Sequence, residues 1–355
     1  MTAIQDYLKV DDAILSHVEE MRTRYKKLFT SPEDCDPMII INTPANMPTW
    51  EEILSDPIIM LKSELDRLRP HFAMMDDHVP TVRVQFGTAQ PASAYGCDIY
   101  IPPNSLPAAA NHVLARIEDA YDLEVPDINA GWYGKLHEWT DIWLESLPEG
   151  IEIQHPDIQS TFNTAHLVRG NDIFMDFYDN PDALDALLTN VTDFMIKITR
   201  VLKNRISDDT EYFYDWGGLW KGTARISNCT MQLLPPELYA DHVKKHDTRF
   251  FREINGGRVH YCGNSREMAM SFMDIDNVCG CDFIAPYEDA PLEICNDLPA
   301  DKVPWLLTDG RDSEICQAIL NGTFPKKRNF ILNTSAPDIE SGKKLLNELR
   351  EAFNK

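Results

Sequence analysis

Two side chains that commonly bind transition metals stand two positions apart in one stretch of the chain, His260 and Cys262. Gly256 and Gly257 end the preceding helical pattern, and Val259 begins a short strand-like run. Because residues i and i+2 of a β-strand point to the same face, His260 and Cys262 could reach one metal ion. A catalytic zinc takes about three protein ligands and keeps one position open. The pair therefore predicts a zinc site, with ordinary packing of the two side chains as the alternative.

A third ligand has to come from elsewhere in the chain. The eight cysteines include no C-x-x-C pair, which excludes a zinc ribbon or a thioredoxin-type motif. The nearest candidates are Cys281 and Cys279, in the strand expected after the one that carries His260 and Cys262. We predict Cys281 as the third ligand. The alternative is that both later cysteines are small buried strand residues.

Three further polar residues follow strand-like runs and are predicted to be catalytic. Asp215 ends an aromatic run and could act as a general base or bind an N–H group of a substrate. Its alternative role is a hydrogen bond to the backbone of Gly217 and Gly218. His155 and Asp157 could form an orienting group and a base, or could cap the loop in which they stand.

The predicted substrate contacts are Arg83, Gln85, Trp216 and Asn333. An arginine that points inward from a strand needs an anionic partner. For Arg83 this is a substrate carboxylate, or alternatively a nearby residue such as Asp77. Trp216 could form an aromatic wall for a flat or methylated ligand, or could pack in the core.

Strands and helices alternate along most of the chain. The clearest helix starts at Asn180 and Pro181 and carries an apolar stripe from Leu184 to Leu202. Such alternation predicts a parallel sheet, and about eight strand–helix units fit a closed (β/α)8 TIM barrel. We expect an N-terminal helical extension over residues 1–35 and the barrel over 36–355. A doubly wound sheet is the alternative, although no G-x-G-x-x-G follows the first strand. Strands are expected at 37–44, 79–87, 97–101, 150–160, 212–216, 258–262, 278–284, 303–310 and 330–334.

Composition narrows the class of partner. The 355 residues carry a formal net charge of -24, which repels nucleic-acid phosphates and anionic membranes. No run approaches the ~18 apolar residues of a membrane span, and no secretory signal is visible. We therefore expect a cytoplasmic protein with reduced thiols that acts on a small molecule and binds neither nucleic acid nor membrane.

Four blocks of the chain resemble the uroporphyrinogen decarboxylase superfamily, and they occur in that superfamily's order. They are Arg169–Pro181 (RGNDIFMDFYDNP), Leu233–Tyr239 before a helix, Val259–Gly263 with its H-x-C-G, and Phe330–Asn333 (FILN) as the last strand. The similar region covers about residues 150–350.

The resemblance implies a (β/α)8 barrel with one of two activities. One branch decarboxylates uroporphyrinogen without a cofactor. The other transfers methyl groups between corrinoid proteins and thiols, using zinc held by H-x-C and by a cysteine on the last strand. This chain lacks the decarboxylase's R-Q-A-G-R and G-H-G motifs, and Ser335 stands nearest to the last-strand cysteine of the methyltransferases.

The resemblance therefore favours zinc-assisted methyl transfer between a corrinoid and a thiol, with a corrinoid protein as a partner. Cys281 would replace the missing ligand, as related methionine synthases take a ligand from the strand after H-x-C. One alternative is decarboxylation of uroporphyrinogen or a related tetrapyrrole without a cofactor. Another is a barrel that binds a corrinoid without turnover.

Overall fold

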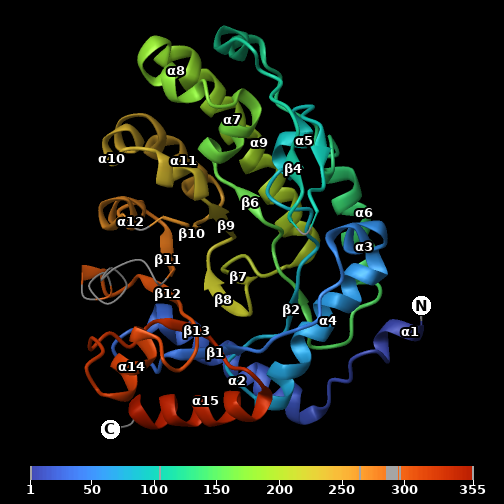
Figure 1. Cartoon of the computed structure of the whole chain (residues 1–355), viewed down its shortest axis with the longest axis vertical. Coiled ribbons are helices and arrows are strands. Elements are labelled where there is room, and N and C mark those ends of the chain that lie inside the picture. Colours follow the sequence, from blue (N-terminus) through green and yellow to red (C-terminus); the bar gives the residue numbers. More distant parts are fainter. Residues whose placement is uncertain (1, 104, 264, 285–294, 296, 354–355) are drawn as a thin grey trace.

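Parallel strands line the inside of a ring and helices cover its outside (Figure 1). The computed structural model describes residues 2–103, 105–263, 265–284, 295 and 297–353. Seven strands form one sheet in the order β1-β13-β12-β11-β10-β9-β6, and each neighbouring pair is parallel. Their bounds are β1 Met38–Asn42, β6 Ile158–Gln159, β9 Ala224–Ser227, β10 Gly257–His260, β11 Val278–Ile284, β12 Val303–Leu307 and β13 Ile331–Ser335.

A second, two-stranded parallel sheet stands between β1 and β6 in chain order. It pairs β2 (Thr81–Val82) with β5 (Glu152–Ile153). In the described part of the chain no ladder joins β1 to β2. The Asp77 and Asp76 carboxylates instead accept the free N–H groups of Ile39 and Ile41 at this edge of β1, at 2.7 and 2.8 Å. The architecture is thus TIM-barrel-like, without hydrogen-bonded closure among the described strands.

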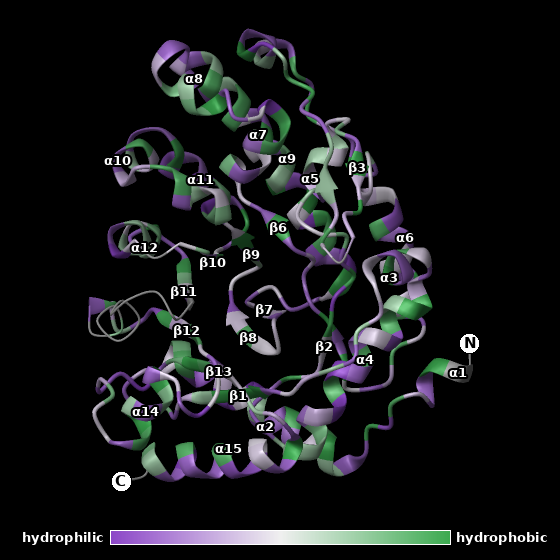
Figure 2. Ribbon diagram, viewed as in Figure 1, coloured by the Kyte–Doolittle hydropathy of each residue, from purple (hydrophilic) through white to green (hydrophobic). Residues whose placement is uncertain are grey.

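The outer helices bury an apolar face on the strands. The helix predicted from Asn180 is α9 (Pro181–Ile206), with Pro181 in its first turn and Leu184, Leu187 and Leu188 buried. Figure 2 shows polar and apolar residues alternating along α15 (Ile339–Phe353), whose buried face includes Leu345. The other helices of this layer are α3 Trp50–Ser55, α4 Pro57–Met74, α5 Gln90–Ala94, η1 Ile117–Asp122, α6 Tyr133–Leu144, α7 Thr161–Arg169, α8 Ile173–Asp179, α10 Pro236–Leu238, α11 Lys244–Glu253, α12 Arg266–Met273 and α14 Glu314–Leu320.

Helix α2 and a hairpin fill the end of the barrel where the strands begin. The N-terminal residues form α1 (Thr2–Gln5) and α2 (Asp12–Thr30). The hairpin pairs β7 (Tyr212–Asp215) with β8 (Gly218–Lys221) antiparallel and lies inside the ring (Figure 1). One apolar cluster joins α2, this hairpin and the inward side chains of β1, β12 and β13; its members include Met21, Tyr25, Met38, Ile40, Phe213, Trp220, Val303, Trp305 and Ile331.

The structure corrects two strand predictions. Residues 212–216 do not form a barrel strand, because they belong to the hairpin; the barrel strand of this region is β9. Residues 97–101 contribute only β3 (Ile99–Tyr100), which pairs antiparallel with β4 (Ala108–Ala109) outside the barrel. Among the described residues, no helix combines the length and the apolar character needed to cross a lipid bilayer.

Candidate metal centre

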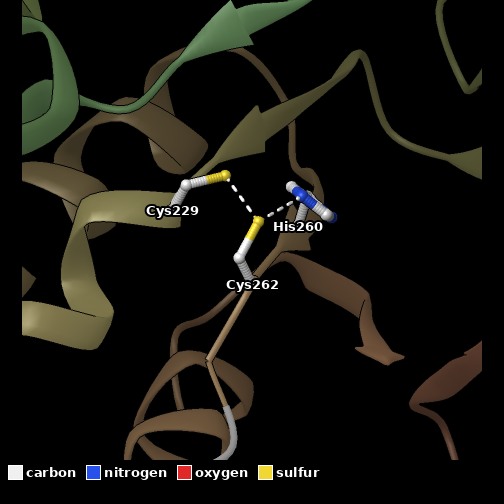
Figure 3. A group of neighbouring side chains, drawn as sticks. All are labelled: Cys229, His260 and Cys262. Carbon is white, nitrogen blue, oxygen red and sulfur yellow. Dashed lines mark hydrogen bonds between the residues drawn. The ribbon is translucent and has the colours of Figure 1, made fainter. Parts of the chain in front are cut away.

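Cys229, His260 and Cys262 converge at the end of the barrel where the strands finish (Figure 3). The Cys262 sulfur lies between the other two groups, 2.8 Å from the Cys229 sulfur and 3.1 Å from His260 Nε2. All three candidate ligand atoms lie within 4.8 Å of one another. One ion with bonds of about 2.0–2.3 Å can bridge such a group.

The pairing of β9 with β10 brings the two cysteines together. In the parallel register Ser227 stands opposite His260, and the Asn228 N–H continues the contact by donating to the His260 carbonyl at 2.8 Å. Cys229 stands two residues after Ser227, in the 3-10 turn η2 (Cys229–Leu233). Cys262 stands two residues after His260, just beyond the end of β10. Both thiols are therefore presented at the mouth of the barrel beside His260.

Cys281, the predicted third ligand, points the other way. It stands opposite Val259 in the ladder, and both side chains lie in the core between strands and helices. The reason is a β-bulge: Gly257 pairs with Val278 but Arg258 pairs with Gly280, so Cys279 is an extra residue that reverses the faces of β11. Burial raises the pKa of the Cys281 thiol to about 12. The structure brings Cys229, not Cys281, to the H-x-C pair.

The bulge places Asp282 beside His260 on the inner face of the barrel. Asp282 Oδ2 lies 2.5 Å from His260 Nδ1, while Nε2 faces Cys262. The other Asp282 oxygen contacts the Arg258 guanidinium, whose Nε also donates to Asp215 at 2.8 Å. A carboxylate on one imidazole nitrogen orients the other nitrogen toward a metal. Sequence reasoning did not single out Asp282, although its place in a strand beside the H-x-C strand was a usable signal.

A second pair of opposite charges lies on the β9 side, with Arg225 buried and Asp157 partly exposed. Arg225 donates to Asp157 at 2.7 Å, and the Ser227 hydroxyl donates to the same oxygen at 2.8 Å. Burial alone would raise the pKa of Asp157, but Arg225 and then Arg83 outweigh it and hold the pKa below its usual value. Asp157 is thus an ionised partner of Arg225 within the barrel.

The pKa values of the two thiols in the cluster shift in opposite directions. The hydrogen bond with Cys229, followed by that with His260, lowers the pKa of Cys262 to about 5. The same thiol–thiol hydrogen bond and burial raise the pKa of Cys229. These contacts favour the thiolate form of Cys262, a form that binds metal ions.

His155 is not part of this cluster. Its ring is 3% exposed and lies near the Pro156 carbonyl and, on α9, the Thr199 carbonyl. Burial lowers the pKa of His155 to about 4, so the ring is neutral at physiological pH. Asp215 also lies below the cluster, where it is 2% exposed and ion-paired with Arg258 rather than bonded to the glycine backbone.

A cavity of about 330 Å³ opens beside His260 and Asp282. Three of the four predicted substrate contacts line it: Arg83, Trp216 and Asn333. The fourth, Gln85, accepts a hydrogen bond from Arg83 at 2.9 Å and does not line the cavity. Arg83 has no partner in Asp77, which pairs instead with Arg24 and Arg350.

Trp216 forms part of the cavity floor because it stands at the tip of the β7–β8 hairpin. The two loop residues, Trp216 and Gly217, have φ angles of 52° and 78°, as a type I′ turn requires. A bulky side chain in this left-handed region is unusual and costs backbone energy. The guanidinium of Arg83 lies 5.0 Å from the Trp216 ring centre and that of Arg225 lies 5.9 Å from it. The strained turn thus presents an indole next to two cations.

No protein-family model matches the chain, and no curated protein matches its sequence. A solved structure does match: a methyltransferase from Methanosarcina mazei aligns with a TM-score of 0.67 over 94% of this chain and 98% of that one. The two sequences are 15% identical. At this identity the likeness establishes a shared fold.

Replacing Asp282 with asparagine is expected to weaken the affinity of the cluster for a metal ion about 10-fold, because a carboxylate that bonds to a ligating imidazole typically contributes 10- to 100-fold to metal affinity. Competition with a chromophoric chelator would measure the change. Asp309→Asn, an exposed residue just after β12, is the matched control and should bind like the unmodified chain. Equal affinity of Asp282→Asn and this control would contradict the role of Asp282.

Proposed function

We propose that this chain is a methyltransferase that moves a methyl group from a corrinoid to a thiol, with zinc held by Cys229, His260 and Cys262. The observation that carries the proposal is the cluster of two thiols and one imidazole at the mouth of the barrel. Active sites of TIM barrels lie at this end of the strands. The similarity in fold to a methyltransferase from Methanosarcina mazei supports the same class of reaction.

The residues of the cluster suit zinc. Thiolate and neutral imidazole are ligands that zinc prefers, and three protein ligands leave one position for a substrate. Asp282 fixes which nitrogen His260 offers, and Arg225 favours negative charge on the nearby cysteines. Bound zinc would lower the pKa of a substrate thiol and hold it as the nucleophilic thiolate.

The cavity beside His260 is the proposed binding place for the acceptor thiol. Its volume of about 330 Å³ is at the small end of the range for ligand sites, roughly 300–1,000 Å³. Trp216 offers an apolar surface, while Asn42 and Asn333, which are bonded to each other at 2.7 Å, offer amide groups. These groups would orient the body of the acceptor while its sulfur reaches the metal side of the cavity.

Decarboxylation of a tetrapyrrole has less support. That alternative assigned Asp215 to the pyrrole N–H groups, but its carboxylate is engaged by Arg258 and buried. A corrinoid-binding barrel without turnover remains a distinct outcome of the test below.

The purified chain is expected to contain about one zinc and to demethylate methylcobalamin in the presence of small thiols. Elemental analysis and mass spectrometry of the thioether product would measure both. His260→Ala should lose the metal and the activity, since it removes one of three ligands. His155→Gln removes a buried histidine from outside the cluster and should keep the zinc.

Zinc retained by His260→Ala would overturn the proposed centre. Corrinoid binding without a methylated product would favour the non-catalytic barrel, and turnover of uroporphyrinogen would favour the decarboxylase.

A further inference from the structure

Cys229 stands two residues beyond the end of β9, in a turn that the sheet does not hold directly. His260 ends β10 and Cys262 follows it by two residues, whereas Cys229 stands in the 3-10 turn η2 after β9. A short turn has few hydrogen bonds of its own, so other groups must fix where its first side chain points. The residues around η2 show what does so.

One side of the turn is hydrogen-bonded to a side chain of α7. Asn163 Oδ1 accepts the N–H of Thr230 at 2.7 Å, and the Asn163 amide donates to Gln159 of β6 at 2.8 Å. This bond orients the residue after Cys229.

The other side is bonded to a buried carboxylate. Asn228, the residue before Cys229, donates from Nδ2 to Asp247 Oδ2 at 3.1 Å, and the Tyr239 hydroxyl donates to the same oxygen at 3.1 Å. We call Asn228, Tyr239 and Asp247 the polar clamp. Its members are 0%, 0% and 1% exposed, so the contacts are shielded from water.

The polar clamp also reaches the strand of the other two candidate ligands. The backbone N–H of Asn228 donates to the His260 carbonyl. The Tyr239 ring packs edge-on against Phe272 at 5.0 Å, and Phe272 packs in the same way against Tyr261, between His260 and Cys262, at 5.3 Å. The clamp therefore touches both segments that supply the metal centre.

The buried carboxylate of Asp247 lowers the stability of the core. Within the described chain its carboxylate accepts hydrogen bonds from two neutral groups alone, and its Oδ1 has no partner. Burial raises the pKa of Asp247 to about 6. An apolar residue would fill this place at lower cost, because burying a charge without a cation is unfavourable. Tyr239 also begins the π-helical turn η3 (Tyr239–Val243), a rare conformation that is frequent near functional sites.

We infer that Asp247 is a positioning residue for the metal centre: through Asn228 and Tyr239 it sets the turn that aims Cys229 at His260 and Cys262. This inference rests on the proposed zinc centre and adds to it a supporting residue that touches neither the metal nor the substrate. The clamp contributes affinity for zinc rather than stability of the fold.

The test compares zinc affinity with thermal stability in four variants, with the metal alone as the probe. Asp247→Leu removes the acceptor and should weaken zinc binding about 10-fold, which is at the lower end of the effects measured for residues that hold a metal ligand in place. Asp247→Asn keeps an acceptor oxygen and should restore affinity to within about 3-fold of the unmodified chain. Asn228→Ala removes the link to the turn and should behave like Asp247→Leu; it decides the matter if Asp247→Leu does not fold.

Asp176→Leu is the matched control, since Asp176 is a buried carboxylate that pairs with Arg169 away from η2. It should lower the melting temperature and leave the zinc affinity unchanged. A clamp that is merely structural would behave like this control, so unchanged affinity in Asp247→Leu or Asn228→Ala would overturn the inference. An unmodified chain that binds no zinc would instead refute the proposed function itself, before any variant is compared.

Discussion

Replacing Cys229 with serine is expected to weaken zinc binding on the order of 10³-fold and to abolish methyl transfer. A hydroxyl is a poor zinc ligand at neutral pH, so only His260 and Cys262 would remain. The structure makes this the most informative single substitution, because the Cys229 sulfur stands 2.8 Å from that of Cys262. Chelator competition measures the affinity, and the rate of methylcobalamin demethylation measures the activity.

Cys281→Ala is the control for this experiment. Cys281 is also a cysteine of the strand region, but it is 0% exposed and faces the helices. Its loss should lower the stability slightly and leave one zinc per chain. If instead Cys281→Ala loses the metal and Cys229→Ser retains it, the assignment of the third ligand is wrong.

The H-x-C pair was predictable because its geometry is local. His260 and Cys262 were predicted to share one face of a strand over 258–262; β10 ends at His260, and the two side chains are nevertheless in contact because they are close in sequence. The long helix α9 was predictable for the same reason, since its stripe and its first-turn proline are contained in one segment.

Cys229 was missed because the strand before it was missed. The aromatic run at Tyr212 has the composition of a strand, whereas β9 is four residues long and carries an arginine on its inner face. One signal was present: Ala224 and Ile226 alternate with Arg225 and Ser227, which is the pattern of a strand with one polar face. A cysteine two residues after such a strand was a candidate ligand.

Cys281 was predicted in place of Cys229 because the faces of β11 cannot be counted from the sequence. A bulge at Cys279 inserts one residue, so every later side chain changes face. The same bulge points the Cys281 side chain outward and the Asp282 side chain toward His260. The bulge depends on the pairing of two strands, which local patterns do not reveal.

Replacing Arg258 with methionine is expected to destabilise the fold by about 3–5 kcal/mol, because it leaves the buried Asp282 carboxylate without an arginine and leaves Asp215 with Arg225 alone, at 3.4 Å. Arg258 is 1% exposed and is paired with both Asp215 and Asp282. Its guanidinium also lies against two indoles that stack on each other, 4.4 Å from the ring centre of Trp220 and 5.2 Å from that of Trp305. Thermal unfolding should show a melting temperature lower by about 4–7 °C.

Arg252→Met is the control, since the Arg252 side chain is 66% exposed and its change should stay within about 0.5 kcal/mol. Adding Asp215→Asn to Arg258→Met removes a buried carboxylate that would keep only Arg225 as its cation, and it should recover part of the loss, whereas Asp282 would stay without an arginine beside His260. Arg258→Met alone should also bind zinc more weakly, because Arg258 would no longer hold Asp282 in place beside His260. A melting temperature that falls no further than in Arg252→Met would show that the charges of the barrel core do not depend on Arg258.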